Sequence, residues 1–274
     1  MFTKALSVAA LAIASVSAQT STLCNPLTTT CQPDPAFGKD TVHCDFTKGE
    51  CSAFENVSGM EIQHNEKGAV FTIAGAGQAP TLATGKFLFF GRVDIEIQAA
   101  PGQGIITSAV LQSNDLDEID FEFIGGDNAQ VQSNYFSKGD VSTYDRGAFH
   151  PVENPTGQFH IYSIEWTSKW INWIIDNNVV RTLNYADAKG GYAFPQTPMQ
   201  VKLGTWTGGS PDASPGTVIW AGGLADYSNG PFTGYYKSIS IVDYAGGDAP
   251  TTKSVREYVY GDNTGSYQSI KVVS

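Results

Sequence analysis

The stretch Asp117-Glu-Ile-Asp-Phe-Glu-Phe-Ile124 decides how the rest of the sequence is interpreted. Side chains on a β-strand alternate between two faces, so Glu118, Asp120 and Glu122 share one face. The opposite face carries only apolar side chains: Ile119, Phe121 and Phe123. The apolar set can pack between two sheets, and the acidic set then points away from that core. We therefore expect a strand over residues 118–124.

The sequence on both sides of this stretch repeats the same kind of pattern. From residue 40 onward, short alternating apolar runs are separated by Gly, Pro, Asn and Asp, which favour turns. Further strands are predicted at residues 69–74, 91–98, 105–112, 130–136, 160–166, 199–205 and 235–243, and residues 255–273 alternate enough to belong to the fold. Asn177-Asn178 predicts a tight hairpin turn, because Asn tolerates positive φ.

Helical spacing of apolar residues is missing from every long segment, which leaves at most a turn or two of helix around residues 185–189. Many strands at regular spacing with Gly-rich turns predict an all-β fold, a β-jelly-roll sandwich of two antiparallel sheets. We see neither an internal repeat nor a linker that would divide it.

Residues 1–18 have the pattern of a secretory signal peptide. Lys4 supplies a positive charge, residues 5–16 are apolar, and Val16-Ser17-Ala18 is a small-residue cleavage site. The apolar run is too short to span a bilayer core of roughly 30 Å. We expect an exported protein with an N-terminal arm at residues 19–39 and a single large domain at residues 40–274.

The four cysteines form two pairs of equal spacing, Cys24/Cys31 and Cys44/Cys51. In an exported protein they indicate disulfides, for which three connectivities are possible. We favour Cys24–Cys31 and Cys44–Cys51, because each bond would close a short loop that contains turn residues. A metal site is not expected, since neither the cysteines nor the four histidines have a recognisable ligand spacing.

The charge balance is acidic, with 27 Asp and Glu against 16 Lys and Arg. An excess of negative charge argues against nucleic acid or an anionic membrane surface as a partner. It is compatible with a neutral substrate, although an acidic surface is also simply a soluble one.

Alternation alone does not indicate function, because Arg92-Val-Asp-Ile-Glu-Ile-Gln98 alternates equally well with a polar face of mixed charge. What distinguishes residues 118–124 is three acids in successive positions of one face with no basic residue between them. Like charges so placed repel, which a strand selected only for stability would tend to avoid. We therefore interpret the three acids as candidate catalytic groups.

The spacing of the glutamates indicates a reaction type. At about 3.3 Å per residue, the Cα atoms of Glu118 and Glu122 lie roughly 13 Å apart. Side chains that lean toward each other can approach the carboxyl separation of roughly 5–5.5 Å that retaining glycosidases use. Asp120 lies between them, where it can orient a neighbour and help to separate the two glutamate pKa values.

Glu118-Ile-Asp-Phe-Glu122 resembles the Glu-x-Asp-x-Glu signature of glycoside hydrolase family 16, and the chain is most similar to the fungal Crh-type cell-wall transglycosylases. The similarity extends from the paired cysteines to about Tyr244. Its companion motifs are Asn134-Tyr-Phe136 with Lys138-Gly139, Phe159-His-Ile-Tyr-Ser-Ile-Glu-Trp166, Leu203-Gly-Thr-Trp206 and Ile219-Trp-Ala-Gly-Gly223.

The resemblance implies a jelly roll with a concave substrate cleft and assigns the roles in it. Glu118 would be the nucleophile, Glu122 the acid/base and Asp120 their assistant. The implied reaction cleaves chitin or a related β-glycan and rejoins the fragment to β-glucan or chitin, crosslinking the fungal cell wall. No cofactor is implied. We expect a monomer in the cell wall or medium, with any membrane attachment through a lipid anchor on a C-terminal tail absent from this sequence.

Sugar rings stack on aromatic side chains and accept hydrogen bonds through their hydroxyls. Val201-Lys-Leu-Gly-Thr-Trp206 alternates so that Lys202, Gly204 and Trp206 share one face, which would suit a sugar subsite. By the resemblance, Lys202, Trp206 and Thr217 fall among donor contacts with Trp220 nearby. Two polar residues of the strand after the acidic one are further candidates: Gln132 and Asn134.

Three alternatives stay open. An endo-β-glucanase or a chitin hydrolase of the same fold would share every residue named so far, and a non-catalytic lectin-like module would use the same aromatic side chains. Asn56-Val-Ser58 is a sequon that predicts N-glycosylation of Asn56.

Overall fold

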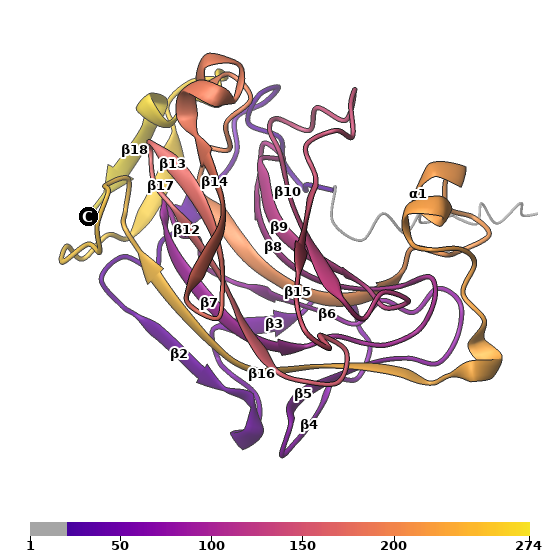
Figure 1. The fold of residues 1–274 in the computed structure, drawn as a ribbon. Coiled ribbons are helices and arrows are strands. Elements are labelled where there is room, and N and C mark those ends of the chain that lie inside the picture. The colour runs from indigo at the N-terminus through magenta and orange to yellow at the C-terminus, as the bar shows by residue number, and fades with distance from the viewer. Residues whose placement is uncertain (1–20) are drawn as a thin grey trace, which may run out of the picture.

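The computed structural model describes residues 21–274, so the predicted leader at residues 1–18 lies outside the described residues. Two large antiparallel sheets pack face to face, as predicted for a jelly roll (Figure 1). The seven-stranded sheet runs in the order β11 (Ala148–Pro151), β10 (Gln130–Phe136), β9 (Glu118–Ile124), β8 (Ile105–Ser113), β15 (Met199–Thr207), β6 (Thr81–Thr84) and β3 (Phe54–Asn56).

The eight-stranded sheet covers the inner face of the first one. Its order is β14 (Asn178–Asn184), β13 (Trp170–Ile175), β12 (His160–Trp166), β7 (Gly91–Gln98), β16 (Phe232–Asp243), β5 (Gly68–Ile73) and β4 (Gln63–Asn65), with β2 (Val42–Asp45) paired to β16. A three-stranded sheet contains β1 (Asp34–Pro35), β17 (Glu257–Tyr260) and β18 (Ile270–Val273). Strands therefore form within the alternating segment 255–273, as expected.

The described residues contain few helices, and these are short. They are α1 (Pro215–Trp220) and the 3-10 turns η1 (Phe46–Lys48), η2 (Tyr185–Asp187), η3 (Lys189–Gly191), η4 (Tyr227–Asn229) and η5 (Tyr267–Ser269). None of the helices within residues 21–274 has the length and apolarity needed to cross a membrane.

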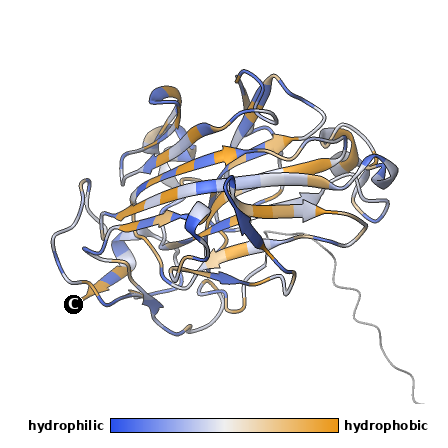
Figure 2. Cartoon of the chain, turned by 90° about the horizontal axis from the view of Figure 1, so that it is seen from below, coloured by the Kyte–Doolittle hydropathy of each residue, from blue (hydrophilic) through white to orange (hydrophobic). Residues whose placement is uncertain are grey.

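The core lies between the two large sheets and follows from the alternation (Figure 2, where strands carry alternating orange and blue bands). Phe121 and Phe123 of β9 are buried and contact the ring of Tyr162 on β12 edge-on, at centroid distances of 5.5 and 4.7 Å. Trp173 of β13 is fully buried and donates from Nε1 to the backbone oxygen of Asp120 at 2.9 Å. The apolar face of β9 is thus fixed against the second sheet, as predicted.

Two local predictions were wrong. The helix α1 was not expected; it begins after Ser214, whose side chain accepts a hydrogen bond from the Thr217 backbone N–H. The hairpin turn lies one residue earlier than predicted, because the positive φ angles belong to Asp176 and Asn177, whereas Asn178 already pairs with Ile175. The first error concerns a short helix and the second concerns the position of a turn. In both cases several residues can supply the same backbone geometry.

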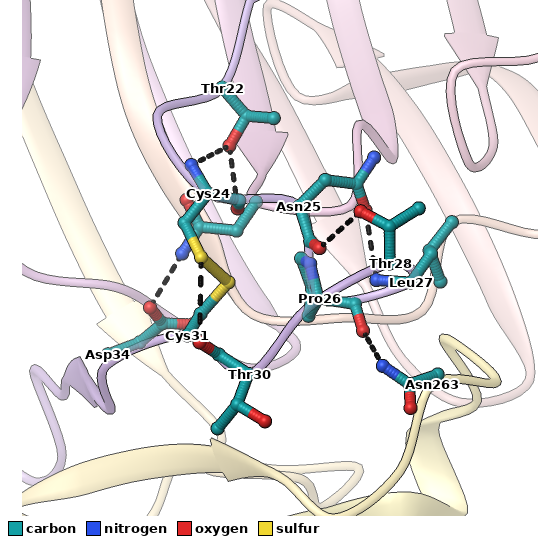
Figure 3. The surroundings of a disulfide bond; sticks show 11 residues. Thr22, Cys24, Asn25, Pro26, Leu27, Thr28, Thr30, Cys31, Asp34 and Asn263 are labelled. Atoms are coloured by element: carbon teal, nitrogen blue, oxygen red, sulfur yellow. Dashed lines mark hydrogen bonds between the residues drawn. A yellow bond between two sulfur atoms is a disulfide. The ribbon is translucent and has the colours of Figure 1, made fainter.

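The N-terminal arm is fastened to the end of the chain (Figure 3). The predicted disulfides Cys24–Cys31 and Cys44–Cys51 are both present. The Asn263 side chain donates to the Pro26 backbone oxygen, and β1 pairs with β17. Because the arm pairs with the last strands, both ends of the described chain belong to one packed unit.

Candidate active site

The three acids of β9 lie on the face that points away from the second sheet, because their apolar neighbours fill the core. The register places Gln112 of β8 beside Glu118, and Asn134 and Gln132 of β10 beside Asp120 and Glu122. Residues directly opposite in an antiparallel pair project to the same face. The acids therefore share their face with polar side chains from both neighbouring strands, and we call this the carboxylate face.

The acids are not a solvated polar surface. Glu118 is 6% exposed and Asp120 is 0% exposed, and only Glu122 is partly open. Carboxyl groups removed from water resist ionisation, and neighbouring carboxyl groups resist it further. Burial of three acids on one strand is costly to stability, which favours a functional reason for their presence.

Glu118 has polar partners on the side of β8. Gln112 Nε2 donates to Glu118 Oε2 at 2.9 Å, and Lys202 Nζ of β15 donates to Gln112 Oε1 at 2.5 Å. Burial raises the pKa of Glu118 to about 7, against the lowering effects of Asp120, Lys202 and Gln112. The positive charge and the two hydrogen bonds all favour the ionised form of Glu118.

Asp120 lies in a different environment. Within residues 21–274, neither of its carboxyl oxygens receives a hydrogen bond. Burial raises its pKa well above the ordinary value, and so do the charges of Glu122 and Glu118; Arg181 acts in the opposite direction. The hydrogen bond between Asp120 and Glu118 raises the pKa of Asp120 and lowers that of Glu118, so it favours a proton on Asp120 and an ionised Glu118.

The environments separate the two glutamates in the direction a retaining reaction needs. Burial and the charge of Glu118 raise the pKa of Glu122 to about 8, above the value of about 7 for Glu118. The causes differ: hydrogen bonds and the charge of Lys202 oppose the rise of the pKa at Glu118, whereas both causes at Glu122 raise it. One group is then suited to attack and the other to donate a proton.

The structure brings together the two tryptophans predicted to bind sugar. Trp206 at the end of β15 and Trp220 at the end of α1 stack with ring centroids 6.1 Å apart and an interplanar angle of 24°. Trp220 Nε1 donates to Gln132 Oε1 at 3.0 Å, which connects α1 to the strand next to β9. Both rings are partly exposed, so a flat apolar surface borders the carboxylate face.

The other predicted contact residues are placed less uniformly. Lys202 lies on the face of Trp206 but uses its ammonium for Gln112, and Asn134 lies beside Asp120 and is partly exposed. Thr217 lies on α1, where its hydroxyl is 2.9 Å from the Ser214 hydroxyl. The sequon residue Asn56 is exposed on β3, and its side chain contacts Ser58 and Met60.

Residues near the acids were also missed. Gln112 is the last residue but one of a strand that is buried throughout, so its role was not visible in the pattern. Phe149 of β11 pairs with Gln132 and is 45% exposed, and Phe136 pairs with Glu118. The alternating segment around Phe149 was too short to identify as a strand. The available signal in the sequence was a phenylalanine between Gly147 and His150.

The family follows from comparison with known proteins. The family model described as Glycosyl hydrolases family 16 matches residues 41–222, which include the carboxylate strand, Lys202, Trp206 and α1. This chain belongs to glycosyl hydrolases family 16. In this family-16 chain, the Glu-x-Asp-x-Glu signature coincides with the buried strand β9.

Its relatives include fungal Crh-like proteins. Crh-like protein 5 of Aspergillus fumigatus is 48% identical over 255 residues, which are 93% of this chain and 62% of the relative. Crh-like protein 4 of Botryotinia fuckeliana is 46% identical over 277 aligned positions, covering 100% of this chain and 70% of the relative. The chain thus spans less than two thirds of the length of the first relative, and the same is true of two others, at 56% and 54%.

Solved structures agree on the fold. The structure described as Crh5 transglycosylase in complex with NAG superposes with a TM-score of 0.85 at 48% identity, covering 91% of this chain and 99% of that one. A β-glucanase of Bacillus licheniformis has a TM-score of 0.60 at 17% identity, covering 73% of this chain and 97% of that one. The second similarity shows the shared jelly-roll fold alone.

Proposed function

We propose that this chain is a retaining transglycosylase that cleaves chitin or a related β-glycan and transfers the fragment to β-glucan. One observation carries the proposal: three acids lie on one face of β9, two of them buried, and hydrogen bonds and the charge of Lys202 favour the ionised form at Glu118, whereas burial and a like charge favour the protonated form at Glu122. The similarity to the Crh5 transglycosylase, over 99% of that chain, supports transfer over simple hydrolysis.

The mechanism is a double displacement. Glu118 attacks the anomeric carbon while Glu122 gives its proton to the departing glycosidic oxygen, which forms a covalent glycosyl-enzyme. Glu122, now ionised, then removes the proton from an acceptor hydroxyl, whose oxygen displaces Glu118 with retained configuration. If the acceptor is a glucan hydroxyl the outcome is a crosslink, and if it is water the outcome is hydrolysis.

Asp120 assists both steps through its proton. As donor to Glu118, it stabilises the carboxylate before attack and again when Glu118 departs from the sugar. Trp173 forms a hydrogen bond with the Asp120 backbone, and the Arg181 guanidinium lies 4.6 Å from the Trp173 ring. These contacts support β9 from the side of the second sheet.

The two sides of β9 divide the glycan. We place the donor against Trp206 and Trp220, with Thr217 and Lys202 as polar candidates, and we propose that Gln132 and Asn134 of β10 hold sugar hydroxyls beside the acids. We place the acceptor toward β10 and β11, where Phe149 is exposed beside Gln132. An aromatic platform on each side provides stacking surface for two sugar chains.

The proposal extends to where the protein works. We infer a monomeric, exported protein of the fungal cell wall, with residues 1–18 removed, residues 19–39 as the arm, residues 40–274 as one catalytic domain, and a glycan on Asn56. The proposal includes attachment to the cell surface through a lipid anchor.

The test is to incubate the protein with chitin oligomers and a labelled β-1,3- or β-1,6-glucan oligomer, and to analyse the products by mass spectrometry. A hybrid of the two oligomers supports transfer. Shortened chitin without any hybrid identifies a hydrolase of the same fold, and binding without bond cleavage identifies a lectin-like module.

A further inference from the structure

Tyr236 of β16 reaches across the core to the backbone of the other large sheet. Its side chain is 0% exposed. Its Oη lies 2.8 Å from the Ser108 backbone oxygen, 2.8 Å from the Gly204 backbone oxygen and 3.1 Å from the Gly204 backbone nitrogen. Ser108 of β8 and Gly204 of β15 lie directly opposite each other. One hydroxyl from the second sheet therefore contacts three of the four backbone polar groups of this pair.

The pair of Ser108 and Gly204 lies next to the proposed acid/base. Ser108 is also opposite Glu122, so the three residues form a row across β9, β8 and β15 and project to the carboxylate face. On β15, Lys202 and Trp206 share that face on either side of Gly204. The pair thus connects the strand beside Glu122 to the strand that carries the donor-side candidates.

This row has little side chain to hold its shape. Gly204 has no positive φ, and a Cβ placed there would meet no atom closer than Thr81 Oγ1 at 3.4 Å. Neither the backbone conformation nor crowding therefore requires a glycine at this position. The missing side chain leaves space on the carboxylate face between Lys202 and Trp206, and the backbone there is held from the core side by Tyr236.

The Tyr236 hydroxyl is suited to this role because it both donates and accepts. Burial raises its pKa, and the hydrogen bonds with Gly204 and Ser108 act in the opposite direction. The proton is shared between the two carbonyl oxygens, and the hydroxyl oxygen accepts from the Gly204 N–H. The ring is fixed in turn by Phe71, whose ring meets it edge-on at a centroid distance of 4.6 Å.

We propose that Tyr236 is a positioning residue for the first chemical step. Its hydroxyl fixes β15 relative to β8 and so aligns a donor sugar bound on β15 with the proton of Glu122. The inference rests on the proposed function, because it takes Glu122 as the acid/base and β15 as the donor side. Tyr236 itself is buried in the core and does not contact the sugar, and the donor contacts of Lys202 and Trp206 remain as proposed.

The test compares two donors that differ in their need for Glu122. In both, Glu118 forms a bond to the anomeric carbon and the bonding electron pair leaves with the departing oxygen. With a chitin oligomer, that oxygen takes the proton of Glu122. With a 2,4-dinitrophenyl β-glycoside of an N-acetylglucosamine trimer, dinitrophenolate leaves without a proton. A misaligned Glu122 therefore slows the first donor more than the second.

Tyr236→Phe removes the hydroxyl and keeps the ring. It should lower kcat for chitin oligomers by about tenfold and leave KM within about threefold, because the alignment of the proton is lost rather than a sugar contact. The release of dinitrophenolate in the first turnover should fall by less than about threefold. Both rates are measured at a temperature where thermal unfolding shows the variant to be folded.

Tyr162→Phe is the matched control. Tyr162 is also fully buried, and its ring packs behind β9 on Phe121 and Phe123. Among the described residues its hydroxyl has no hydrogen-bond partner. Tyr162→Phe should therefore leave both rates unchanged.

The outcomes separate this inference from the proposed function. If the wild-type protein releases no dinitrophenolate and cleaves no chitin at any pH, the retaining function itself is refuted. A Tyr236→Phe variant that loses thermal stability but keeps both rates shows a purely structural residue and overturns the inference. Equal falls for the two donors overturn it as well, as does the same selective loss in Tyr162→Phe.

A second variant covers the case in which Tyr236→Phe does not fold. Phe71→Leu keeps the hydroxyl but loosens the ring that carries it, and it should show a smaller selective loss with chitin oligomers. An unchanged ratio between the two donor rates in Phe71→Leu would then overturn the inference.

Discussion

Strands β7 and β9 alternate equally well and bury their apolar faces in the same core, yet their polar faces differ in kind. On β7, Arg92 forms an ion pair with Asp94 at 2.8 Å, and Glu96 forms one with Lys237 at 2.8 Å. These side chains are a quarter to two fifths exposed. On β9, no acid within the described chain forms a direct ion pair, and two of the three are almost completely buried.

The shape of the surface does not explain the difference. The polar face of β7 borders a hollow of about 500 Å³ lined by Asp94, Glu96 and Lys237. Acids that line a hollow therefore occur on the face of β7 as well, so a hollow lined by acids does not by itself mark a catalytic site. The two faces differ in how the acidic charges are compensated. The acids of β7 have cationic partners, whereas the burial of acids on β9 costs electrostatic free energy, which a role in a reaction would explain.

The largest expected difference between the strands is catalytic. Glu118→Gln should lower transfer by at least roughly 10³-fold, because no other group can form the glycosyl-enzyme. Asp94→Asn on β7 should leave the rate essentially unchanged. Rates of hybrid-product formation test this, with chitin-oligomer binding by calorimetry as the folding control. Equal losses in both variants would contradict a catalytic distinction between the strands.

The second difference concerns the proton donor. Glu122→Ala should lose roughly 10²–10⁴-fold with unactivated donors. With azide and a 2,4-dinitrophenyl β-glycoside of an N-acetylglucosamine trimer, whose leaving group needs no proton, it should regain turnover and release a β-glycosyl azide, since azide needs no general base. Glu96→Ala should give no azide product. A glycosyl azide of inverted configuration, identified by proton NMR, would rule out the double displacement.

The third difference is thermodynamic. The pKa values of Glu118 and Glu122 rise from an ordinary 4.5 to about 7 and about 8, so the folded state binds these protons more tightly than the unfolded state. The protonated forms of Glu118 and Glu122 stabilise the fold fully below pH 4.5, and this stabilisation is lost as the pH rises through 7 and 8. Glu118→Gln with Glu122→Gln should therefore raise the free energy of unfolding at pH 8 by about 1–2 kcal/mol and flatten its pH dependence.

The matched pair on β7 should behave in the opposite way. Asp94→Asn with Glu96→Gln removes two ion pairs and should lower stability by up to about 1 kcal/mol. Denaturant unfolding at pH 5 and pH 8 measures both pairs of variants. Asp34 and Asp115, whose pKa values burial raises to about 7, contribute equally to all variants, so differences from wild type isolate the two strands. If the stability of the β9 variant still falls with rising pH as it does in the wild type, the raised pKa values of Glu118 and Glu122 do not cause that fall.

The sequence predicted what depends on neighbours along the chain. The bounds of β7, β9, β10 and β12 follow from alternation between polar and apolar residues, and the short disulfide loops follow from cysteine spacing. The short strand β11 was missed, because four residues carry too little pattern. The Ser214-Pro215 pair, an N-cap followed by a first-turn proline, was the available signal for α1.

What the sequence could not supply is pairing across distance. Gln112 and Lys202 are 90 residues apart, and only the register of β15 against β8 brings their side chains together. Sequence reasoning placed Lys202 on the face of Trp206 but could not pair it with Gln112. The burial of Asp120 could not be predicted either, because an acid on the polar face of an alternating strand is expected to be exposed until the neighbouring strands are known.

The smallest expected difference concerns two tryptophans, Trp220 of α1 beside the carboxylate face and Trp170 of the other sheet. Trp220→Phe keeps a ring to stack on Trp206 but removes the hydrogen bond to Gln132, which should raise the KM for the chitin donor by about fivefold, equivalent to about 1 kcal/mol, with little change in kcat. Trp170 of β13, partly exposed on the other sheet, is the matched control, and Trp170→Phe should leave both constants unchanged. Steady-state kinetics with chitin oligomers of increasing length decide the matter. An effect of Trp220→Phe on kcat alone would mean that α1 positions the acids through Gln132, and would move Trp220 from the sugar-binding surface to the support of the carboxylate face.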